Sequence, residues 1–382
     1  MKIAYLLGSL NRGGTETLLL DVFKNASKAN FSFIGIYRKI GTLQADFYAT
    51  EMPFFQLSPK FPFDIFYFFK LRKLLKREKV NVVHAQQSLD AVYARVACLG
   101  TRIKVVQTLH GYDDLTAKKD KLMSLSFKLT DKNIFVSNFQ REYYTKKYNL
   151  KPEKQATVYN GISFEKFDEK HETPDFLRHC GLDPQSPNNL EDSDFRQNDG
   201  EKLKMAMVGN FGRGRDQNSV CKFLKLLHDE GVAFDFYFIG LRFETEAWRY
   251  DDCVQYCTEN GLNDCVHFLG ARNDVPAILQ NIDAFIYSTD HDTFGLAVIE
   301  AIAVGIPTFV NDWEVMTEIT NNGEWATLYK TKNEQDLLQK FVSFLLQKEK
   351  YQLKAQKSAE KVREKFSIES HINELSKVYN KL

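Results

Sequence analysis

The stretch STDHDTFGLAVIEAIAVGIP, residues 288–307, contains the residue types best suited to holding a charged ligand. Glu300 lies in an otherwise apolar helix pattern, where a carboxylate is costly unless it faces a cleft or accepts hydrogen bonds. We expect a helix to begin near Phe294, so the backbone amides of residues 293–296 would form its N-terminus, a natural seat for a diphosphate. Asp292 stands just before this helix, where Asp is a common N-cap.

A glycine-rich turn near the start of the chain, GSLNRGGTE at residues 8–16, suggests related chemistry. Its spacing nearly matches a nucleotide-binding P-loop, but Gly14 and Thr15 stand where that loop has Lys and Thr. Because the phosphate-binding lysine is missing, we do not expect hydrolysis of a nucleoside triphosphate. Gly13 and Gly14 leave two interpretations open, a tight strand-to-helix turn or a close approach of backbone amides to a phosphate or sugar.

The elements that must position these residues are short apolar runs alternating with amphipathic helical patterns. Such runs predict strands buried on both faces of a parallel sheet. The fold class is therefore α/β, with two Rossmann-like, doubly wound domains and ligands at the carboxyl ends of the strands, in the cleft between the domains. The expected strands are residues 2–7, 31–37, 80–85, 103–110, 132–137, 156–160, 204–209, 234–240, 266–270, 283–288 and 306–310.

The change in composition from residue 171 to residue 202 divides the chain. This segment is rich in Pro, Asn, Asp and Ser and has little periodic hydrophobicity, which is typical of a linker or a disordered insertion. We therefore expect an N-terminal domain at residues 1–168, a linker at 169–202 and a C-terminal domain at 203–365.

The composition of the 382 residues is that of a globular protein, with 43% hydrophobic and 26% charged residues and a net charge of +1. This balance argues against a nucleic-acid partner, whose phosphates would require a basic excess. The many Phe and Tyr residues mostly fall inside apolar runs, so we expect them in the core. The six cysteines form no CxxC pair and are interpreted as reduced thiols. With neither a signal peptide nor a membrane-spanning run, the expected location is the cytoplasm.

An ordered set of motifs resembles glycosyltransferase family 4, whose members are retaining enzymes of the GT-B architecture. An acidic residue, Asp292, is followed after seven residues by Glu300, within a pattern similar to (E/D)xFGLxxxEAxAxGxP. The resemblance extends over nearly the whole chain. Its other parts are GGTE at 13–16, VVHAQ at 82–86, TLHGYD at 108–113, FVSNF at 135–139, VYNGISFEKF at 158–167, MVGNFGRGRDQ at 207–217 and VHFLGARNDV at 266–275.

The resemblance implies roles for residues of the C-terminal domain, which would bind the donor, a nucleotide-diphosphate sugar linked to UDP or GDP. Glu300 would hold the ribose hydroxyls, and Asp292 would contact the donor sugar, although it is one methylene shorter than the Glu usual in the family. Arg215 stands where the family usually has a phosphate-binding lysine. The amides of Phe294, Gly295 and Leu296 would seat the diphosphate, Arg213 would replace an arginine that is Asn210 here, and Arg272 would lie near the base.

In the N-terminal domain the resemblance implies an acceptor side. Gly14 would approach the donor diphosphate or the acceptor, and Gly13 and Glu16 would line the acceptor side. His110 matches the active-site histidine of the family, and Asp113 follows it at a spacing often seen there. The final helix, residues 366–382, would cross back to pack on this domain.

The implied function is retaining transfer of a hexose-type sugar to a glycan or lipid-linked acceptor in surface polysaccharide synthesis. No cofactor and no metal are expected, because arginines and a helix N-terminus would stabilise the leaving diphosphate. Three alternatives stay open. Asp290 and Asp292 form a DxD, the metal motif of single-domain glycosyltransferases; the chain could be an inactive nucleotide-sugar-binding scaffold; and a nucleotide-sugar epimerase shares the architecture.

The segment FPFDIFYFFKLRKLLKREK, residues 61–79, combines aromatic residues with a basic run. We favour an ordinary core helix with solvated lysines. The alternative is a helix that touches an anionic membrane near a lipid-linked acceptor, which would place the chain peripherally on the inner face of the membrane.

Overall fold

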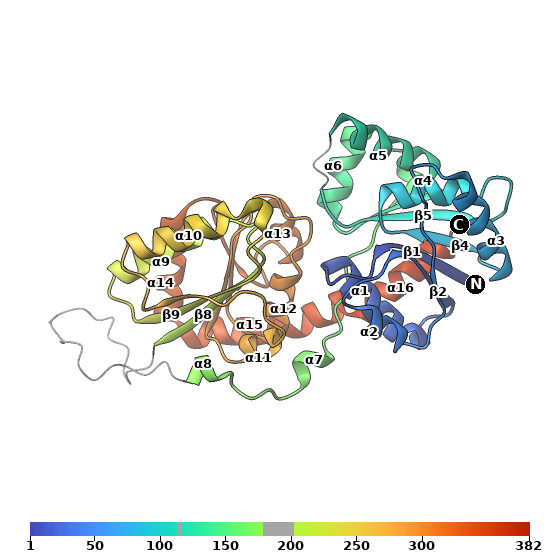
Figure 1. The fold of residues 1–382 in the computed structure, drawn as a ribbon. Helices are drawn as coiled ribbons and strands as arrows, with labels where there is room; N and C mark the ends of the chain where they lie inside the picture. The colour runs from blue at the N-terminus through green and yellow to red at the C-terminus, as the bar shows by residue number, and fades with distance from the viewer. Residues whose placement is uncertain (113–115, 179–201) are drawn as a thin grey trace. The chain divides into compact units, whose positions relative to one another are not determined.

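The computed structural model describes residues 1–112, 116–178 and 202–382. The chain divides into two compact units, each built on one sheet (Figure 1). The first unit comprises Met1–Ser163 and Phe366–Leu382, and the second comprises Phe164–Lys365.

The sheet of the first unit is entirely parallel, and its strand order is β3-β2-β1-β4-β5-β6-β7. The order reverses between β1 and β4, as in a doubly wound sheet. All six strands expected in this half are present, and β3 is an additional edge strand. The strands are β1 (Lys2–Ser9), β2 (Ser32–Lys39), β3 (Phe54–Gln56), β4 (Val82–Ala85), β5 (Lys104–Leu109), β6 (Lys132–Phe135) and β7 (Gln155–Thr157).

The helices of the first unit cover both faces of this sheet (Figure 1). They are α1 (Gly14–Lys24), α2 (Gln44–Tyr48), α3 (Ile65–Arg77), α4 (Ser88–Ala97), α5 (Ala117–Leu129), α6 (Asn138–Tyr148) and α16 (Ile368–Tyr379), with 3-10 turns η1 (Ala26–Lys28) and η2 (Pro152–Lys154).

Strand β1 shows how one apolar run serves two cores. Successive side chains of a strand point to opposite faces, so Ile3, Tyr5 and Leu7 join one hydrophobic cluster while Ala4 and Leu6 join another. The first cluster contains side chains of α1 and α16, and the second contains side chains of α3 and α4. A strand buried on both faces has no polar alternation, which is why the sequence identified it.

The last helix belongs to the first unit although it follows the second unit in sequence. Its apolar residues Ile368, Ile372 and Leu375 recur at helical spacing and enter the same cluster as Tyr5. Backbone hydrogen bonds tie its start to the end of the first unit's chain, because the Ile162 N–H donates to Phe366 O at 2.9 Å and the Ile368 N–H donates to Ile162 O at 3.0 Å.

The sheet of the second unit is also parallel, with the order β10-β9-β8-β11-β12-β13. The five expected strands are present, and β13 is an additional edge strand. They are β8 (Leu203–Val208), β9 (Phe234–Ile239), β10 (Val266–Phe268), β11 (Ala284–Tyr287), β12 (Thr308–Asn311) and β13 (Thr327–Tyr329).

The remaining helices follow the order of the chain. They are α7 (Glu165–Asp168), α8 (Asp175–Arg178), α9 (Gln217–Asp229), α10 (Trp248–Glu259), α11 (Val275–Gln280), α12 (Leu296–Val304), α13 (Glu314–Ile319), α14 (Glu334–Leu346) and α15 (Lys348–Phe366), with the 3-10 turn η3 (Glu244–Glu246). Among the helices that the structure describes, none has the length and apolarity needed to cross a bilayer.

The first residues of the segment expected to be a linker pack against the second unit. Leu177 in α8 is fully buried, and the ring of Phe176 contacts that of Tyr237 at 5.2 Å between centroids. The His171 N–H donates to the Gln280 side chain at 3.3 Å. The linker therefore does not begin at residue 169, and the rest of it, residues 179–201, lies outside the described residues.

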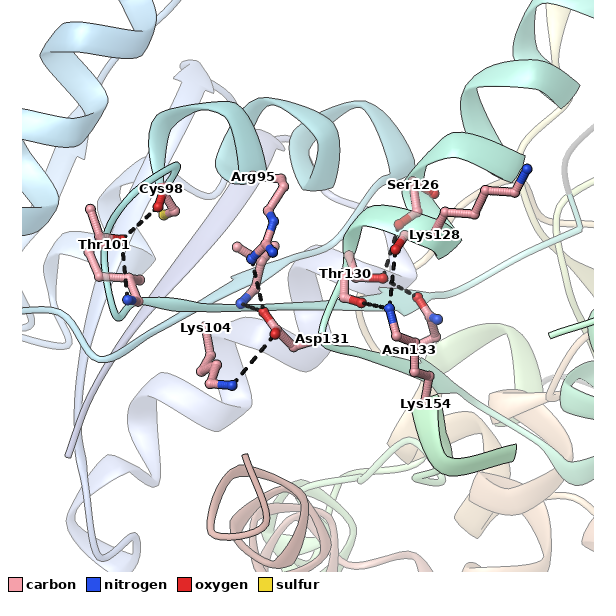
Figure 2. A network of polar contacts seen from close by, with 12 residues as sticks. Arg95, Cys98, Thr101, Lys104, Ser126, Lys128, Thr130, Asp131, Asn133 and Lys154 are labelled. Carbon is pink, nitrogen blue, oxygen red and sulfur yellow. Dashed lines mark hydrogen bonds and ion pairs between the residues drawn. The ribbon is translucent and has the colours of Figure 1, made fainter. Parts of the chain in front are cut away.

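A polar network lies at the amino-terminal ends of strands β5 and β6 in the first sheet (Figure 2). Asp131, just before β6, accepts the Val105 N–H at 2.9 Å and pairs with Arg95 and Lys104. The buried Asn133 side chain accepts from the Thr130 hydroxyl at 2.6 Å. These groups satisfy one another at the amino ends of β5 and β6, whereas ligands of such sheets bind at the carboxyl ends.

Candidate functional site

The neighbouring strands β8 and β11 bring two loops together at the carboxyl edge of the second sheet, where the strand order reverses. The Asp216 N–H, in the loop after β8, donates to Ser288 O after β11 at 3.1 Å. The Thr289 hydroxyl donates to Gly214 O. These contacts join two segments that lie far apart in sequence.

Gly214 is required by the geometry of this junction. Its φ of +88° lies in the left-handed region, and a Cβ on it would lie 3.0 Å from the carbonyl oxygen of His291. Arg213 beside it is exposed. Burial first, and then the positive charge of Arg213, lowers the pKa of His291.

Asp292 is the centre of the polar contacts in this junction. Its Oδ2 accepts the hydroxyl of Tyr287 at 2.8 Å and pairs with Arg215 Nη1 at 3.1 Å. Its Oδ1 accepts the N–H of Thr293 at 2.8 Å and the N–H of Phe294 at 3.4 Å. The carboxylate is thus both a local cap and the partner of an arginine.

The electrostatics of this cluster fix its protonation. Burial is the main cause that holds the pKa of Tyr287 well above its usual value, and the adjacent Asp292 carboxylate raises it further, so the phenol stays a hydrogen-bond donor. For Arg215, burial lowers the pKa, but Asp292 and Tyr287 outweigh burial and the pKa is raised. The Arg215 guanidinium lies 5.4 Å from the centroid of the Tyr287 ring.

One donor of Arg215 is left without an internal acceptor. Its Nε is buried and has no hydrogen-bond partner among the described residues. A Cβ on Gly209 would lie 3.1 Å from this Nε, so the glycine permits the close approach of the guanidinium to the end of β8. The side chain as a whole is 27% exposed, so a charged and partly unsatisfied guanidinium is accessible at this edge and is suited to binding an anion.

The helix after this junction begins later than expected. We expected it near Phe294, but α12 begins at Leu296 and Gly295 is its N-cap, with a φ of +84°. A Cβ on Gly295 would meet the Met316 side chain at 2.7 Å, so the turn is closed by a glycine. Of the amides expected to seat a diphosphate, those of Thr293 and Phe294 donate to Asp292, whereas those of Gly295 and Leu296 have no acceptor within the helix.

Glu300 has a partner in the same unit. Its side chain is 18% exposed, and Oε1 accepts from Lys166 Nζ of α7 at 3.2 Å. A carboxylate in this apolar helix was expected either to face a cleft or to accept hydrogen bonds, and the second condition is met. A ribose hydroxyl at Glu300 would share this carboxylate with a cation.

Other residues expected near the donor are held by their neighbours. Arg272 forms a two-bond pair with Asp274, at 2.7 Å and 2.6 Å, and lies 4.9 Å from the centroid of the Phe176 ring. Asn210, which stands where the family has an arginine, accepts the Leu241 N–H at 2.9 Å and so links the ends of β8 and β9. No contact joins either residue to Asp292 among the residues that the structure describes.

The two acidic residues of the DxD pattern have different partners. Asp290 Oδ2 pairs with Lys332 Nζ at 3.4 Å, whereas Asp292 pairs with Arg215. Each carboxylate is thus neutralised by a cation of the chain itself.

The glycine turn of the first unit forms the start of α1. Gly13 is the N-cap in extended conformation, and Gly14 is the first helical residue. A Cβ on Gly13 would lie 2.7 Å from Glu16 Oε2, so the glycine leaves room for that carboxylate to fold back over the helix N-terminus. Burial raises the pKa of Glu16.

His110 is half-buried, directly follows β5, and lies near the buried histidines His84 and His371. Its Nε2 donates to Gln86 Oε1 at 2.7 Å. Burial, with a smaller contribution from His371, lowers the pKa of His110 to about 3, so the imidazole is neutral near pH 7. Asp113, expected on the same side, lies outside the described residues.

Three polar residues at these strand ends were not singled out from the sequence. Tyr287 holds Asp292, and Gln86 holds His110. His84 contacts the Tyr379 hydroxyl through Nδ1 at 2.5 Å and the hydroxyl of Thr108 through Nε2 at 2.6 Å. Each comes at or near the carboxyl end of a central strand, and this position was the available signal.

Comparison with known proteins gives matches over most of the chain. Residues 12–166 match the description Glycosyltransferase Family 4, and residues 189–362 match Glycosyl transferases group 1.

Among curated proteins, the chain is 28% identical to an N,N'-diacetylbacillosaminyl-diphospho-undecaprenol alpha-1,3-N-acetylgalactosaminyltransferase of Campylobacter jejuni, over 76% of this chain and 74% of that protein. It is 26% identical to a UDP-Gal:alpha-D-GlcNAc-diphosphoundecaprenol alpha-1,3-galactosyltransferase of Escherichia coli, over 63% of this chain and 60% of that protein. A solved structure of Anabaena Alr3699/HepE in complex with UDP has a TM-score of 0.83 at 15% identity, with full coverage of both chains.

The two parallel, doubly wound sheets and the likeness to this solved structure place the chain in the GT-B fold class. Within that class, the chain belongs to the glycosyltransferases of family 4 and group 1. Several of its relatives are named for transfer to undecaprenol-linked glycans or for capsular polysaccharide biosynthesis, and another is an N-acetyl-alpha-D-glucosaminyl L-malate synthase.

Proposed function

We propose that this chain transfers a hexose-type sugar from a UDP-linked donor to a lipid-linked glycan, with retention of the anomeric configuration and without a metal ion. The observation that carries the proposal is the cluster of Arg215, Asp292 and the N-terminus of α12 at the junction of β8 and β11. The names of the relatives support the donor and the acceptor, since one includes UDP-Gal and two include a diphospho-undecaprenol.

The donor diphosphate would lie against Arg215 and the amides of Gly295 and Leu296. In the transfer step, the bond between the sugar C1 and the β-phosphate oxygen breaks, and its electron pair stays on the diphosphate. Negative charge therefore grows next to a guanidinium that is already fixed by Asp292 and Tyr287, so little reorganisation is needed. Arg213, exposed in the same loop, would add a second positive charge.

The acceptor hydroxyl would form the new bond to C1 on the face that the diphosphate leaves. Its proton would pass to the departing phosphate oxygen, so the step needs no external base and the configuration is retained. Asp292 would contact the sugar with a carboxylate whose negative charge favours the developing positive charge on the ring. Glu300 would bind the ribose, and its pairing with Lys166 would fix its orientation.

The proposed function is tested by donor binding and by slow donor hydrolysis. Purified protein is incubated with UDP-, GDP- and ADP-sugars, and thermal stabilisation and released nucleotide are measured. We expect one UDP-sugar to stabilise the wild type, and Arg215→Ala to weaken its binding at least tenfold, because a charge-assisted bond contributes about 1.5–3 kcal/mol. Glu300→Ala should weaken binding of the nucleotide sugar in the same assay.

A matched control is Arg249→Ala, which removes an arginine that also pairs with a carboxylate, Glu246, and lies over an aromatic ring, that of Trp248. This variant should bind the donor like the wild type. Binding without hydrolysis or transfer would favour an inactive scaffold, and failure of every nucleotide sugar to bind the wild type would contradict the transferase function.

A further inference from the structure

The segment from Phe61 to Lys79 differs from the core helix that we favoured from the sequence. One stripe of α3 is indeed buried, because Tyr67, Leu71 and Leu75 recur at helical spacing and belong to the cluster beneath the helix. The opposite face is not polar. It exposes large apolar side chains at the N-terminal end of the segment, namely Phe61, Phe63, Ile65, Phe66 and Phe69.

The exposure of these side chains is large for aromatic residues. Phe66 is 69% exposed and Phe69 is 64% exposed, although a folded chain normally hides such rings. Ile65, Phe66 and Phe69 lie on the face of α3 opposite its buried stripe, and Phe61 and Phe63 lie in the loop directly before the helix. We call these five residues the aromatic patch.

The loop that begins the aromatic patch is held in an unfavourable backbone conformation. Phe63 has a φ of +59°, which is rare for a bulky residue. Contacts with Tyr93 of α4 hold this conformation, because the Phe63 N–H donates to the Tyr93 hydroxyl at 3.4 Å and the two rings lie 5.8 Å apart between centroids. Strain at a residue that still leaves its ring half exposed suggests a function for the exposed ring.

The C-terminal half of α3 carries positive charge on the same outer face. Lys70, Lys73 and Lys76 are exposed, and none forms a salt bridge with any residue that the structure describes. The backbone hydrogen bond from Lys60 is the main cause that lowers the pKa of Asp64, and the charge of Lys70 adds to it from a greater distance. The helix itself, Ile65–Arg77, contains no acidic residue, and its N-cap Asp64 is buried and accepts the N–H groups of Phe66 and Tyr67. The chain as a whole has a net charge of only +1, so this concentration of unpaired lysines is local.

We propose that the aromatic patch and the lysines of α3 bind the surface of an anionic lipid bilayer. Rings of this kind enter the boundary between headgroups and acyl chains, and lysines one or two turns away contact lipid phosphates. A protein partner would be expected to cover the rings with complementary apolar surface, whereas the unpaired lysines beside the rings call for an extended negative surface. The proposal rests on the proposed function, because a lipid-linked acceptor lies in a membrane.

The test is co-sedimentation of the purified full chain with vesicles of phosphatidylcholine alone or with phosphatidylglycerol added. We expect binding to the mixed vesicles, weak binding to the neutral vesicles, and a decrease in binding as salt is raised. Lys70→Gln, Lys73→Gln and Lys76→Gln together should weaken binding to mixed vesicles by roughly a hundredfold, since each lysine near such a surface contributes about fivefold. Phe66→Ser with Phe69→Ser should weaken binding to both vesicle types.

A control variant has matched chemistry on another helix. Leu353 is 57% exposed in α15, and the exposed Lys357 follows one turn later without an ion pair among the described residues. Leu353→Ser with Lys357→Gln should bind vesicles like the wild type. Far-ultraviolet circular dichroism checks that every variant is folded, and substitutions at exposed positions should leave the fold intact.

The outcomes separate this proposal from the proposed function. If the α3 variants bind mixed vesicles like the wild type, or if the wild type does not prefer them over neutral vesicles, the membrane proposal is wrong. It is also wrong if the Phe variants dissociate a dimer seen by sedimentation velocity, since the patch would then be a contact between copies. Binding of UDP-sugar by the α3 variants should be unchanged, so loss of donor binding in the wild type would contradict only the transferase function.

Discussion

Replacing Tyr287 by Phe tests whether Asp292 is held in place by a buried hydrogen bond. The substitution keeps the ring, which is fully buried, and removes only the hydroxyl that donates to Asp292 Oδ2 at 2.8 Å. A hydrogen bond to a charged group contributes about 1.5–3 kcal/mol. Because Asp292 keeps Arg215 and two backbone amides, we expect a loss at the lower end, about 1.5–2 kcal/mol.

The assay is thermal unfolding followed by calorimetry, together with donor hydrolysis. For a unit of this size, a loss of about 2 kcal/mol lowers Tm by roughly 4–8 °C. The control is Tyr329→Phe, which removes a buried hydroxyl that donates to the neutral carbonyl oxygen of Tyr287 at 2.9 Å. This control should cost about 1 kcal/mol of stability and leave hydrolysis unchanged, whereas Tyr287→Phe should slow hydrolysis, since Asp292 is then positioned less firmly.

A double variant, Tyr287→Phe with Asp292→Asn, tests whether the hydroxyl acts through the charge of Asp292. If the hydroxyl acts through the negative charge of Asp292, its removal should cost less than about 1 kcal/mol when Asp292 is already Asn. A Tyr287→Phe protein that unfolds within about 0.5 kcal/mol of the wild type would refute the account, as would the same cost in both backgrounds.

Two other predictions concern the backbone conformation of Gly214 and the pH dependence of stability. Gly214→Ala should destabilise the second unit by about 1–3 kcal/mol in urea unfolding, because its φ is +88° and the new Cβ would approach His291 O. The control is Gly100→Ala, which has a φ of +65° and no atom within 4 Å of the new Cβ, so it measures the backbone part of this cost alone. Stability should also fall as the pH drops from about 6.5 toward 4, because burial lowers the pKa of His371 to about 4, that of His110 to about 3 and that of His84 well below its usual value, so the unfolded chain binds extra protons. His371 accounts for about 2 kcal/mol of this loss between pH 7 and pH 5, so His371→Gln should reduce the slope by that share and leave the shares of His110 and His84. An unchanged slope in this variant would contradict the assignment of the acid sensitivity to His371.

The sequence predicted the sheets well because central parallel strands are apolar on both faces. The strands it missed, β3 and β13, have three residues each and lie at sheet edges, where burial on both faces is not required. The other two edge strands, β7 and β10, are equally short, and they were predicted because each overlaps a longer expected run, 156–160 or 266–270. The start of α12 was misplaced by two residues, since the sequence does not show that Gly295 adopts a positive φ.

The candidate site could be predicted only in part. The pairing of Arg215 with Asp292 follows from the adjacency of β8 and β11, which the strand order of a doubly wound sheet implies. Tyr287 was missed because an aromatic residue at the end of a buried strand is usually core. The partner of Glu300, Lys166, could not be predicted, because α7 is a single turn with no periodic signal.

The placement of α16 has a consequence for how the protein folds during synthesis. The Tyr379 hydroxyl contacts the hydroxyl of Tyr5 and the ring of His84. Helix α16 therefore completes the core beside β1, although β1 is synthesised much earlier than α16. That face of the N-terminal sheet is covered by α1 but stays incomplete until the ribosome has produced α16. All of Phe164–Lys365 is synthesised before that moment, so the second unit can be folded when the first is completed, in the reverse of the usual order of domain folding.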